Sequence, residues 1–343
     1  MGVALALAER TRGATAPNPN VGCVIVNDGR VVGRGWTQAG GRPHAEAMAL
    51  AQAGDQSRGA TCFVTLEPCA HESARGPACS DLLVFAGMAH VVVALEDPDP
   101  RTAGRGIARL RDAGIDVEVG VEAAAATRSM AGFLTRRAHG RPFVTLKLAT
   151  SLDGCIARAD GESRWITGPE ARAHAHLERA RHEAILVGRG TWQADAPGLD
   201  VRLPGLEGRS PARVVLSTHS QPVPGPPSAE NTLLNTASGM EDVITLSFPT
   251  AIATLPGDHL LVEGGAATAA AFLGADLVDR LLLYRAPILI GGGLPALGDI
   301  GLASLADAHG RWRLADARQL GSDRMEVYVR ASSGSVDTIL PPR

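Results

Sequence analysis

Residues 60–69 read ATCFVTLEPC, and this stretch decides how the first half of the chain is interpreted. Residues 60–66 are mostly apolar or β-branched, which predicts a buried strand. Pro68-Cys69 comes directly after that strand. Upstream, His44-Ala45-Glu46 opens an Ala- and Leu-rich stretch, 44–53, that predicts a helix. The sequence therefore places a cysteine at a strand end and a histidine at a helix start.

Strand and helix signals alternate on both sides of this stretch, a pattern typical of an α/β layered domain. Residues 21–27 and 31–36 predict two strands that form a hairpin around Asn27-Asp28-Gly29. Further elements expected in the first half are strands at 90–95 and 115–119 and helices at 80–86, 106–113 and 122–137.

The pattern is interrupted at Gly140-Arg141-Pro142, so we place a domain boundary near 138–143 and predict domains at 1–140 and 141–343. No strand–G-x-G-x-x-G–helix fingerprint occurs, which disfavours a Rossmann domain. The second half is expected to hold strands at 143–150, 184–187, 213–217, 243–246, 260–262, 281–284 and 325–329, helices at 169–180 and 266–273, surface loops at 203–211 and 220–240, and a frayed tail from 332.

The composition is that of a globular protein with two domains. The 343 residues are 45% hydrophobic and 20% charged, and the net charge of −3 argues against a nucleic-acid binder. Five cysteines form no disulfide scaffold, which favours a reducing compartment. The short apolar start, 3–8, lacks a preceding basic segment, and no apolar run reaches 18 residues. We expect a cytoplasmic protein without a membrane or nucleic-acid partner.

One residue type is almost absent: of the 33 basic residues, Lys147 is the single lysine. The Ala, Gly and Arg excess is typical of a GC-rich genome, in which a lysine can be retained for chemistry that arginine cannot perform. An ammonium group can shift its pKa, whereas a guanidinium stays charged. Chance survival of one lysine is the alternative interpretation.

The first half carries the pattern of a zinc deaminase, H-x-E followed by P-C and a second cysteine. His44, Cys69 and Cys79 supply three ligands and leave a fourth position open, as expected of a catalytic zinc. Glu46 is then free to move protons as the general acid and base. A structural site closed by His71, or no metal at all, are the alternatives.

Nine residues separate the two cysteines, so a loop interrupts the short deaminase spacing. The loop carries His71, Ser73 and Arg75, and we expect it either to hold an anionic part of the substrate or to be a solvated loop. Asn20 enters the first strand with an amide donor and acceptor suited to reading a base edge.

Five motifs in this order resemble the bifunctional riboflavin-biosynthesis deaminase–reductase family: Pro-Asn-Pro-Asn-Val-Gly-Cys from 17, His-Ala-Glu from 44, Thr-Leu-Glu-Pro-Cys from 65, Asp-Pro-Asp-Pro from 97 and Ala-Gly-Arg-Gly from 103. The long cysteine spacing is also similar, although it is one residue longer here. Cys69-Ala70-His71-Glu72 stands where the family has Cys-Ser-His-His. The resemblance implies a three-layer, cytidine-deaminase-like domain that binds Zn²⁺.

The second half resembles the reductase of the same family at Ser-Leu-Asp-Gly from 151, Gly-Glu-Ser-Arg-Trp-Ile-Thr from 161 and Val-Glu-Gly-Gly from 262. This implies a dihydrofolate-reductase-like α/β domain that uses NADPH. By position, the resemblance implies cofactor contacts at Ala149, Trp165, Thr191, Asp195, Thr218 and Gly265, and substrate contacts at Ser163, Arg179, Leu199, Arg202 and Glu263.

Lys147 and Glu263 are similar to the pair proposed for the family's reduction step, which makes Lys147 a proton donor or an orienting group at the sugar. Arg179 and Arg202 suit a substrate phosphate, because guanidinium binds phosphate bidentately; exposed surface charges are the alternative.

The resemblance covers residues 1–330 and implies two consecutive reactions on a phosphorylated ribosylaminopyrimidine, deamination and then reduction of the ribosyl chain to ribityl. It also implies a homo-oligomer. A deaminase of another base is the alternative enzyme, although Arg75 is the single basic residue between the cysteines. A third hypothesis is a non-catalytic protein that keeps an enzyme scaffold. The presence of all four site residues, His44, Glu46, Cys69 and Cys79, argues against it.

Overall fold

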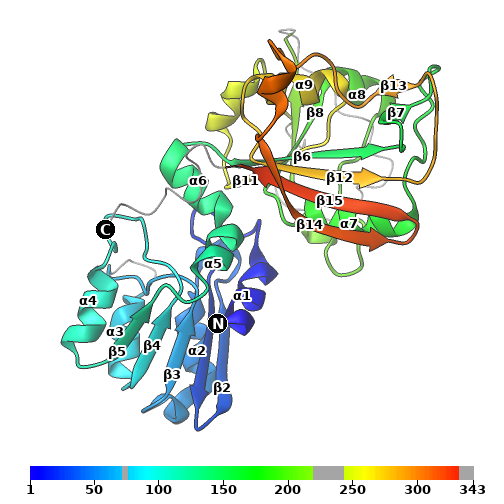
Figure 1. Ribbon diagram of the computed structural model, residues 1–343. Coiled ribbons are helices and arrows are strands. Elements are labelled where there is room, and N and C mark those ends of the chain that lie inside the picture. Colours follow the sequence, from blue (N-terminus) through cyan, green and yellow to red (C-terminus); the bar gives the residue numbers. More distant parts are fainter. Residues whose placement is uncertain (72–75, 219–242, 332–343) are drawn as a thin grey trace. The chain divides into compact units, whose positions relative to one another are not determined.

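The computed structural model describes residues 1–71, 76–218 and 243–331 and divides into two compact units, Met1–Gly140 and Arg141–Arg343 (Figure 1). The predicted loop at 220–240, the tail from 332, and Ser73 and Arg75 lie outside the described residues. Within the described residues, no helix combines the length and the apolar character needed to cross a membrane.

The first unit is built on a five-stranded sheet with the order β2-β1-β3-β4-β5. The hairpin strands β1 and β2 are antiparallel, β1 also pairs antiparallel with β3, and β3, β4 and β5 run parallel. The strands are β1 (Gly22–Asn27), β2 (Arg30–Trp36), β3 (Thr61–Val64), β4 (His90–Val93) and β5 (Asp116–Val119). The sheet is therefore mixed, with the hairpin at one edge.

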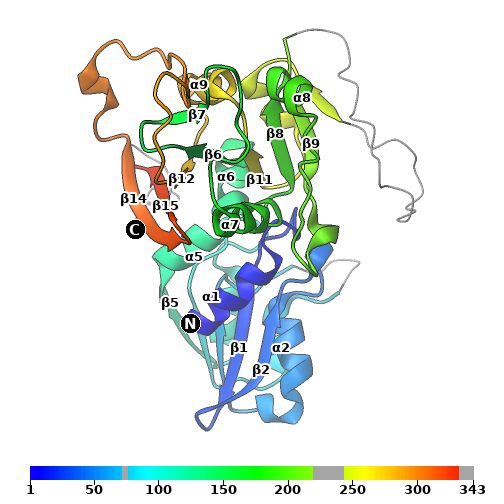
Figure 2. The ribbon, with the colours of Figure 1, turned by 90° about the vertical axis from the view of Figure 1, so that its right-hand side faces the viewer.

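Glycines let helices pack directly on both faces of the hairpin. A Cβ at Gly22 would lie 1.8 Å from the carbonyl oxygen of Ala4 in α1 (Gly2–Ala8). Residues alternate between the faces of a strand, and a Cβ at Gly35 would lie 1.9 Å from the carbonyl oxygen of Ala45 in α2 (Ala45–Ala53). The two helices therefore cover opposite faces and make a three-layer unit, seen with α1 in front of β1 in Figure 2.

The remaining helices of this unit agree with the predictions in all but one place. The predicted helix 122–137 is wrong as a single element, because it is split at Met130 (φ −100°, ψ 19°). The carbonyl of Ser129 accepts a hydrogen bond from the buried Asn20 amide, which draws it out of the helical ladder. The helices are α3 (Cys79–Phe85), α4 (Arg105–Asp112), α5 (Ala123–Ser129) and α6 (Ala131–His139).

The second unit is built on an eight-stranded sheet with the order β10-β9-β8-β11-β6-β12-β15-β14. The first six strands in this order are parallel, and β15 pairs antiparallel with β12 and β14. The strands are β6 (Phe143–Thr150), β8 (Ala184–Gly188), β9 (Ala212–Leu216), β10 (Ile244–Leu246), β11 (His259–Val262), β12 (Arg280–Arg285), β14 (Trp312–Leu320) and β15 (Asp323–Arg330).

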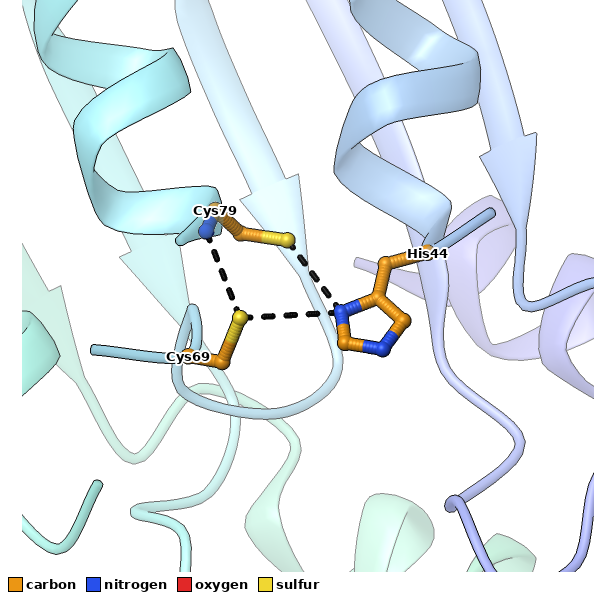
Figure 3. A group of neighbouring side chains, drawn as sticks. All are labelled: His44, Cys69 and Cys79. Atoms are coloured by element: carbon orange, nitrogen blue, oxygen red, sulfur yellow. Dashed lines mark hydrogen bonds between the residues drawn. The ribbon is translucent and has the colours of Figure 1, made fainter. Parts of the chain in front are cut away.

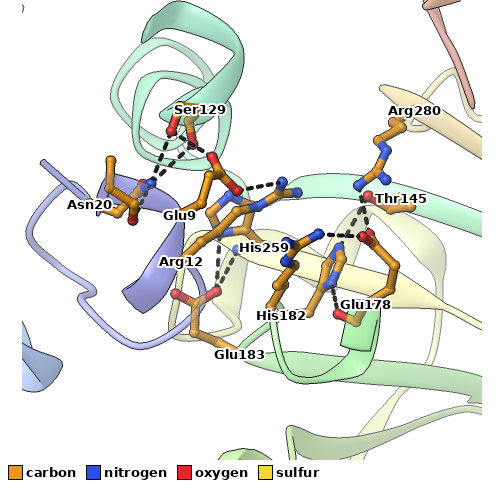
Figure 4. A network of polar contacts seen from close by, with 12 residues as sticks. Glu9, Arg12, Asn20, Ser129, Thr145, Glu178, His182, Glu183, His259 and Arg280 are labelled. Carbon is orange, nitrogen blue, oxygen red and sulfur yellow. Dashed lines mark hydrogen bonds and ion pairs between the residues drawn. The ribbon is translucent and has the colours of Figure 1, made fainter. Parts of the chain in front are cut away.

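Alternation along β6 sends its side chains to two different cores. Leu146 and Leu148 pack with Phe272 of α9 (Ala266–Gly274) on one face. Thr145 and Lys147 therefore face the other side, where the helix α7 (Pro169–Arg179) lies. Thr145 lies there in a polar network with His182, which Figure 4 shows. The same rule places Glu263, which follows Val262 of β11, on the face of Lys147.

The predicted elements of the second half are present, with bounds shifted by one or two residues, and the structure adds others. The edge strand β14 was missed because most of its residues are exposed, with small alanines and three charged side chains that leave only a weak apolar alternation. Also missed were α8 (Arg189–Asp195) and the two-stranded sheet of β7 (Cys155–Ala157) and β13 (Leu294–Pro295).

The close packing of β2 on α2 predicts that Gly35→Ala destabilises the first unit. The added methyl group would overlap backbone, so strand or helix must shift, at a cost of ~1–3 kcal/mol or more. Gly2→Ala is the matched control, because nothing lies within 4 Å of a Cβ at Gly2. Urea unfolding followed by circular dichroism measures both variants, and equal midpoints for Gly35→Ala and Gly2→Ala would contradict this packing.

Candidate active sites

Three side chains that can hold a metal ion converge in the first unit. His44, Cys69 and Cys79 offer donor atoms that all lie within 4.8 Å of one another. His44 Nδ1 is 3.3 Å from Cys79 Sγ and 3.6 Å from Cys69 Sγ (Figure 3). One imidazole nitrogen and two thiol sulfurs are the donors that Zn²⁺ prefers, and three of them leave a tetrahedral position open. The residues present therefore fit a zinc ion.

The fold delivers each of these donors from the end of an element. His44 is the N-cap of α2, Cys69 lies in the loop after β3, and Cys79 begins α3. The backbone N–H of Cys79 donates to Cys69 Sγ at 3.3 Å, and hydrogen bonding from the Cys79 thiol lowers the pKa of Cys69 to about 4. A thiolate is the form of cysteine that binds metal.

Asn18 orients the ligand histidine from behind. Its amide Nδ2 lies 3.0 Å from His44 Nε2 and donates to the carbonyl of Gly41. Gly41 has φ +85°, and a Cβ there would lie 2.7 Å from Asn18 Cγ. Contacts to the second ring nitrogen fix the orientation of a metal-binding histidine. Sequence reasoning missed Asn18, although it stands in the Pro-Asn-Pro-Asn motif two residues before Asn20.

The donor set opens into a cavity of about 430 Å³. Glu46 lines it and is 3% exposed, and burial raises the pKa of its carboxyl to about 7. A carboxyl group with this pKa can accept and return a proton near neutral pH. Asn20 is not among the lining residues; its amide donates to Ala8 and Ser129, and Ser129 in turn donates to Glu9 (Figure 4). Its role as a substrate contact stays a prediction.

A buried carboxylate, Glu67 of the Thr-Leu-Glu-Pro-Cys motif, ties the cavity wall together. Its two oxygens accept four backbone N–H groups, at 2.8 to 3.1 Å, from residues of the loop after β4 and the start of α4: Asp97, Gly104, Gly106 and Ile107. The loop thereby turns Asp97 and Asp99 toward the cavity, which both line. Burial raises the pKa of Asp97 to about 6. Glu67 was not identified from sequence, because its role depends on partners 30 to 40 residues away.

In the second unit, Glu263 brings the predicted reductase residues together. Arg179 Nε and Nη2 donate to its carboxylate at 2.8 and 3.0 Å, and Lys147 Nζ lies 3.6 Å from Oε2. Burial opposes the charge of Glu263, but Lys147 and Arg179 outweigh it and lower the pKa to about 2. The charged carboxylate thus holds two cations on the α7 face of the sheet.

The other predicted substrate residues lie in varied surroundings. Arg179 Nη1 also donates to the carbonyl of Asp200, which brings the 199–202 segment beside Glu263. Arg202 has a 64% exposed side chain that pairs with Asp200. Leu199 packs its side chain in a core with Trp192 and offers no polar group. Ser163 is half-buried, and its role as a substrate contact stays a prediction.

Glycines gather where the predicted cofactor residues Thr191 and Gly265 meet. Gly265 is the N-cap of α9, and a Cβ there would lie 3.4 Å from Thr191 Oγ1. Cβ atoms at Gly188 and Gly264 would lie within 2.2 and 2.5 Å of the Thr268 side chain. A helix N-terminus with glycine in front of it lets a phosphate approach the backbone N–H groups. These residues fit the diphosphate of a dinucleotide.

The remaining predicted cofactor residues lie on other elements of the second unit. The guanidinium of Arg164 donates to the carbonyl of Asp195, which links the loop of Trp165 to α8. Trp165 is 66% exposed and stacks against Arg172, with the guanidinium 4.7 Å from the ring centroid. Thr218 is exposed after β9, and Ala149 is half-buried beside Tyr284 in β12. Their contacts with a cofactor stay predictions.

Comparison with known proteins agrees with this geometry. The family model described as the cytidine and deoxycytidylate deaminase zinc-binding region matches residues 1–95, and that of the RibD C-terminal domain matches residues 142–325. Riboflavin biosynthesis protein RibD of Escherichia coli is 40% identical over 94% of this chain and 96% of its own, and that of Mycobacterium tuberculosis is 39% identical over 96% of both.

Two solved structures resemble the whole chain. RibD of Acinetobacter baumannii superposes with a TM-score of 0.83 at 38% identity and covers 96% of this chain and 98% of its own. The Thermotoga maritima protein, described as a diaminohydroxyphosphoribosylaminopyrimidine deaminase and 5-amino-6-(5-phosphoribosylamino)uracil reductase, superposes with a TM-score of 0.81 at 31% identity and covers 96% and 97%.

The fold and the two sites define a bifunctional enzyme in which a zinc-dependent deaminase precedes an NADPH-dependent reductase. The chain belongs to the RibD family of riboflavin biosynthesis proteins. This confirms the family, the two fold classes, the two activities and the cofactors Zn²⁺ and NADPH that the sequence motifs predicted.

The contact between Asn18 and His44 predicts that Asn18→Ala weakens zinc binding. Removing the partner of the second ring nitrogen frees the imidazole to rotate, and the affinity for zinc should fall ~10–100-fold. Competition with a chromogenic zinc chelator measures the affinity. Asn27→Ala in the hairpin turn is the control, since Asn27 bonds the carbonyls of Gln56 and Arg58 and not a ligand. Equal affinities of the two variants would show that Asn18 does not orient His44.

Proposed function

We propose that residues 1–140 deaminate 2,5-diamino-6-ribosylamino-4(3H)-pyrimidinone 5′-phosphate and that residues 141–343 then reduce its ribosyl chain with NADPH. The final product is 5-amino-6-ribitylamino-uracil 5′-phosphate. The observation that carries this proposal is the convergence of the donors His44, Cys69 and Cys79 beside the cavity that Glu46 lines. The names of the two activities printed for the Thermotoga maritima relative support the choice of substrate.

In the deaminase unit we assign zinc to His44, Cys69 and Cys79. A zinc ion in such a site acidifies water, so that a nucleophile is available at neutral pH. Glu46 accepts one proton from the attacking water and passes it to the ring nitrogen. It then accepts the second proton of that water from the new C–OH group and passes it to the departing amine, so that the carbonyl forms and ammonia leaves. Its burial keeps the carboxyl poised between its two protonation states, because the pKa is raised to about 7. The cavity wall positions the pyrimidine ring against these groups.

The position of His71 supports an open, catalytic site over a structural one. A structural site needs a fourth protein ligand. His71 Nδ1 lies 3.4 Å from Thr102 Oγ1, and His71 is not part of the metal-binding group found among the described residues. The fourth position is therefore available to a small molecule.

In the reductase unit, NADPH, when bound, would supply the hydride for C1′ of the sugar. Conversion of ribosyl to ribityl also requires a proton on the sugar ring oxygen, and we assign its delivery to Lys147. Glu263 holds the ammonium group at 3.6 Å, and Arg179 holds Glu263 in turn. Substrate contacts at Ser163, Leu199 and Arg202 and the cofactor contacts named above complete this assignment.

The composition also bears on where the enzyme acts and what it binds. We infer that the enzyme acts in the cytoplasm as a homo-oligomer on small molecules, and binds neither nucleic acid nor membranes. The net charge of −3 and the absence of disulfides among five buried cysteines support this inference.

Glu46→Gln is expected to lower ammonia release ~10²–10⁴-fold, because the amide cannot exchange protons. Zinc content should be unchanged, since Glu46 is not a ligand. Ammonia release and NADPH oxidation are followed in one tube, and the variant should still oxidise NADPH when it is given the deaminated intermediate. Wild-type ammonia release by the variant would show that Glu46 is not the group that moves the protons.

Lys147→Met is expected to lower NADPH oxidation ~10²-fold or more while ammonia release stays unchanged. The Arg179–Glu263 pair remains in this variant, so the buried carboxylate keeps a partner. Lys147→Arg is the matched control, because it restores the positive charge but does not release a proton. If Lys147→Arg is as active as wild type, Lys147 orients the substrate by charge and is not the proton donor.

A further inference from the structure

We propose that Arg101 and Arg137 form the phosphate subsite of the deaminase cavity, held in position by a shared carboxylate, Asp99. This assignment rests on the proposed function, because the phosphate belongs to the pyrimidine substrate. It adds a substrate-binding site that the sequence motifs do not indicate. Neither arginine was predicted as a site residue.

The two arginines and the zinc donors belong to one cavity. His44, Cys69 and Glu46 line it, and so do Arg101 and Arg137, which come from the loop after β4 and from the last turn of α6. The volume of about 430 Å³ lies in the range of cavities that hold small-molecule ligands. A ligand whose ring lies at the zinc site can therefore extend through this cavity to the two arginines.

Asp99 fixes both guanidinium groups. Its side chain is 6% exposed. Arg101 donates to it through Nε at 3.0 Å and Nη2 at 2.6 Å, and Arg137 donates through Nη2 at 2.6 Å. Hydrogen bonding from Arg101 lowers the pKa of Asp99, so the carboxylate stays charged. Phe133 supports Arg137 from one side, with its ring centroid 5.4 Å from the guanidinium carbon. The pair is thus ordered before a ligand arrives.

The pair still has charge and donors to offer. Two guanidinium groups against one carboxylate leave an excess of one positive charge. A guanidinium has five N–H donors; Arg101 uses two on Asp99 and Arg137 uses one. The two side chains are 61% and 42% exposed, so the remaining donors are accessible. Asp97 also lines the cavity and is mostly charged at neutral pH, because burial raises the pKa of its carboxyl only to about 6; the guanidinium of Arg42, another lining residue, offsets this charge.

A phosphate monoester is the ligand chemistry that this arrangement suits. Guanidinium groups bind phosphate oxygens through paired N–H donors, and fixed geometry lowers the entropy lost on binding. The pair would also make the cavity selective, since a nucleoside without phosphate gains nothing from it. The deaminase would then act before any step that removes the phosphate.

The test uses the full-length, zinc-loaded enzyme with Arg101→Gln, Arg137→Gln and the double variant. Ammonia release is measured with the phosphorylated pyrimidine and with the same compound lacking the phosphate. Each single substitution should raise KM for the phosphorylated compound ~10–100-fold, and the double variant more. Activity on the unphosphorylated compound should stay at the wild-type level. Arg128→Gln is the control, because Arg128 is an exposed arginine of α5 outside the cavity.

Two results would overturn the subsite. Equal losses on both compounds would mean that the arginines only hold the cavity wall, and wild-type KM in the double variant would place the phosphate elsewhere. If the wild-type enzyme releases no ammonia from either compound, the proposed function fails. The subsite is then tested separately, by measuring the binding of ribose 5-phosphate with calorimetry. Loss of a binding site in the double variant would support the subsite, and unchanged stoichiometry would overturn it.

Discussion

The deaminase site depends on one buried carboxylate that is not itself a ligand or an acid–base group. Glu67 follows β3 and precedes the ligand Cys69, and it accepts four N–H groups from the next strand's loop and the start of α4. Gly106 permits this approach, since a Cβ there would lie 2.0 Å from the carbonyl of Pro68. Each buried donor left without an acceptor costs on the order of 1–3 kcal/mol. The segment that carries the ligand Cys69 is consequently held to the cavity wall by the Glu67 side chain.

The reductase site is likewise organised around a buried carboxylate, on the sheet of the second unit. Glu263 directly follows β11, as Glu67 follows β3, and both lie at the carboxyl end of a parallel strand where α/β domains bind ligands. Glu67 satisfies backbone donors, whereas Glu263 neutralises Lys147 and Arg179. A buried charge persists only when it is paired and hydrogen-bonded. Each unit therefore stabilises a carboxylate where its chemistry is performed.

The sequence predicted those parts of the protein that depend on local pattern or on a fixed motif. Apolar runs located all strands of both large sheets except β14. The H-x-E and P-C motifs identified His44, Cys69 and Cys79, which the fold does bring together. It could not distinguish Asn18 from Asn20, because the choice depends on which amide faces His44. The sequence also could not predict the helix break at Met130 or the ion pair of Asp99 with Arg137, because both arise from contacts between residues far apart in the chain.

Both units also pair two cations with one carboxylate. In each, one buried carboxylate binds two cations, Arg101 and Arg137 on Asp99, and Lys147 and Arg179 on Glu263. In the reductase unit, a lone cation at the position of Lys147 or Arg179, whose side chains are 20% and 14% exposed, would lose hydration without compensation. In either unit, a balanced pair would offer no net charge to an anion. Sharing one carboxylate avoids both problems and leaves one positive charge in a fixed place. Because Arg179 directs three donors to Glu263 and Asp200, Lys147 is the cation of its pair that remains available for proton chemistry.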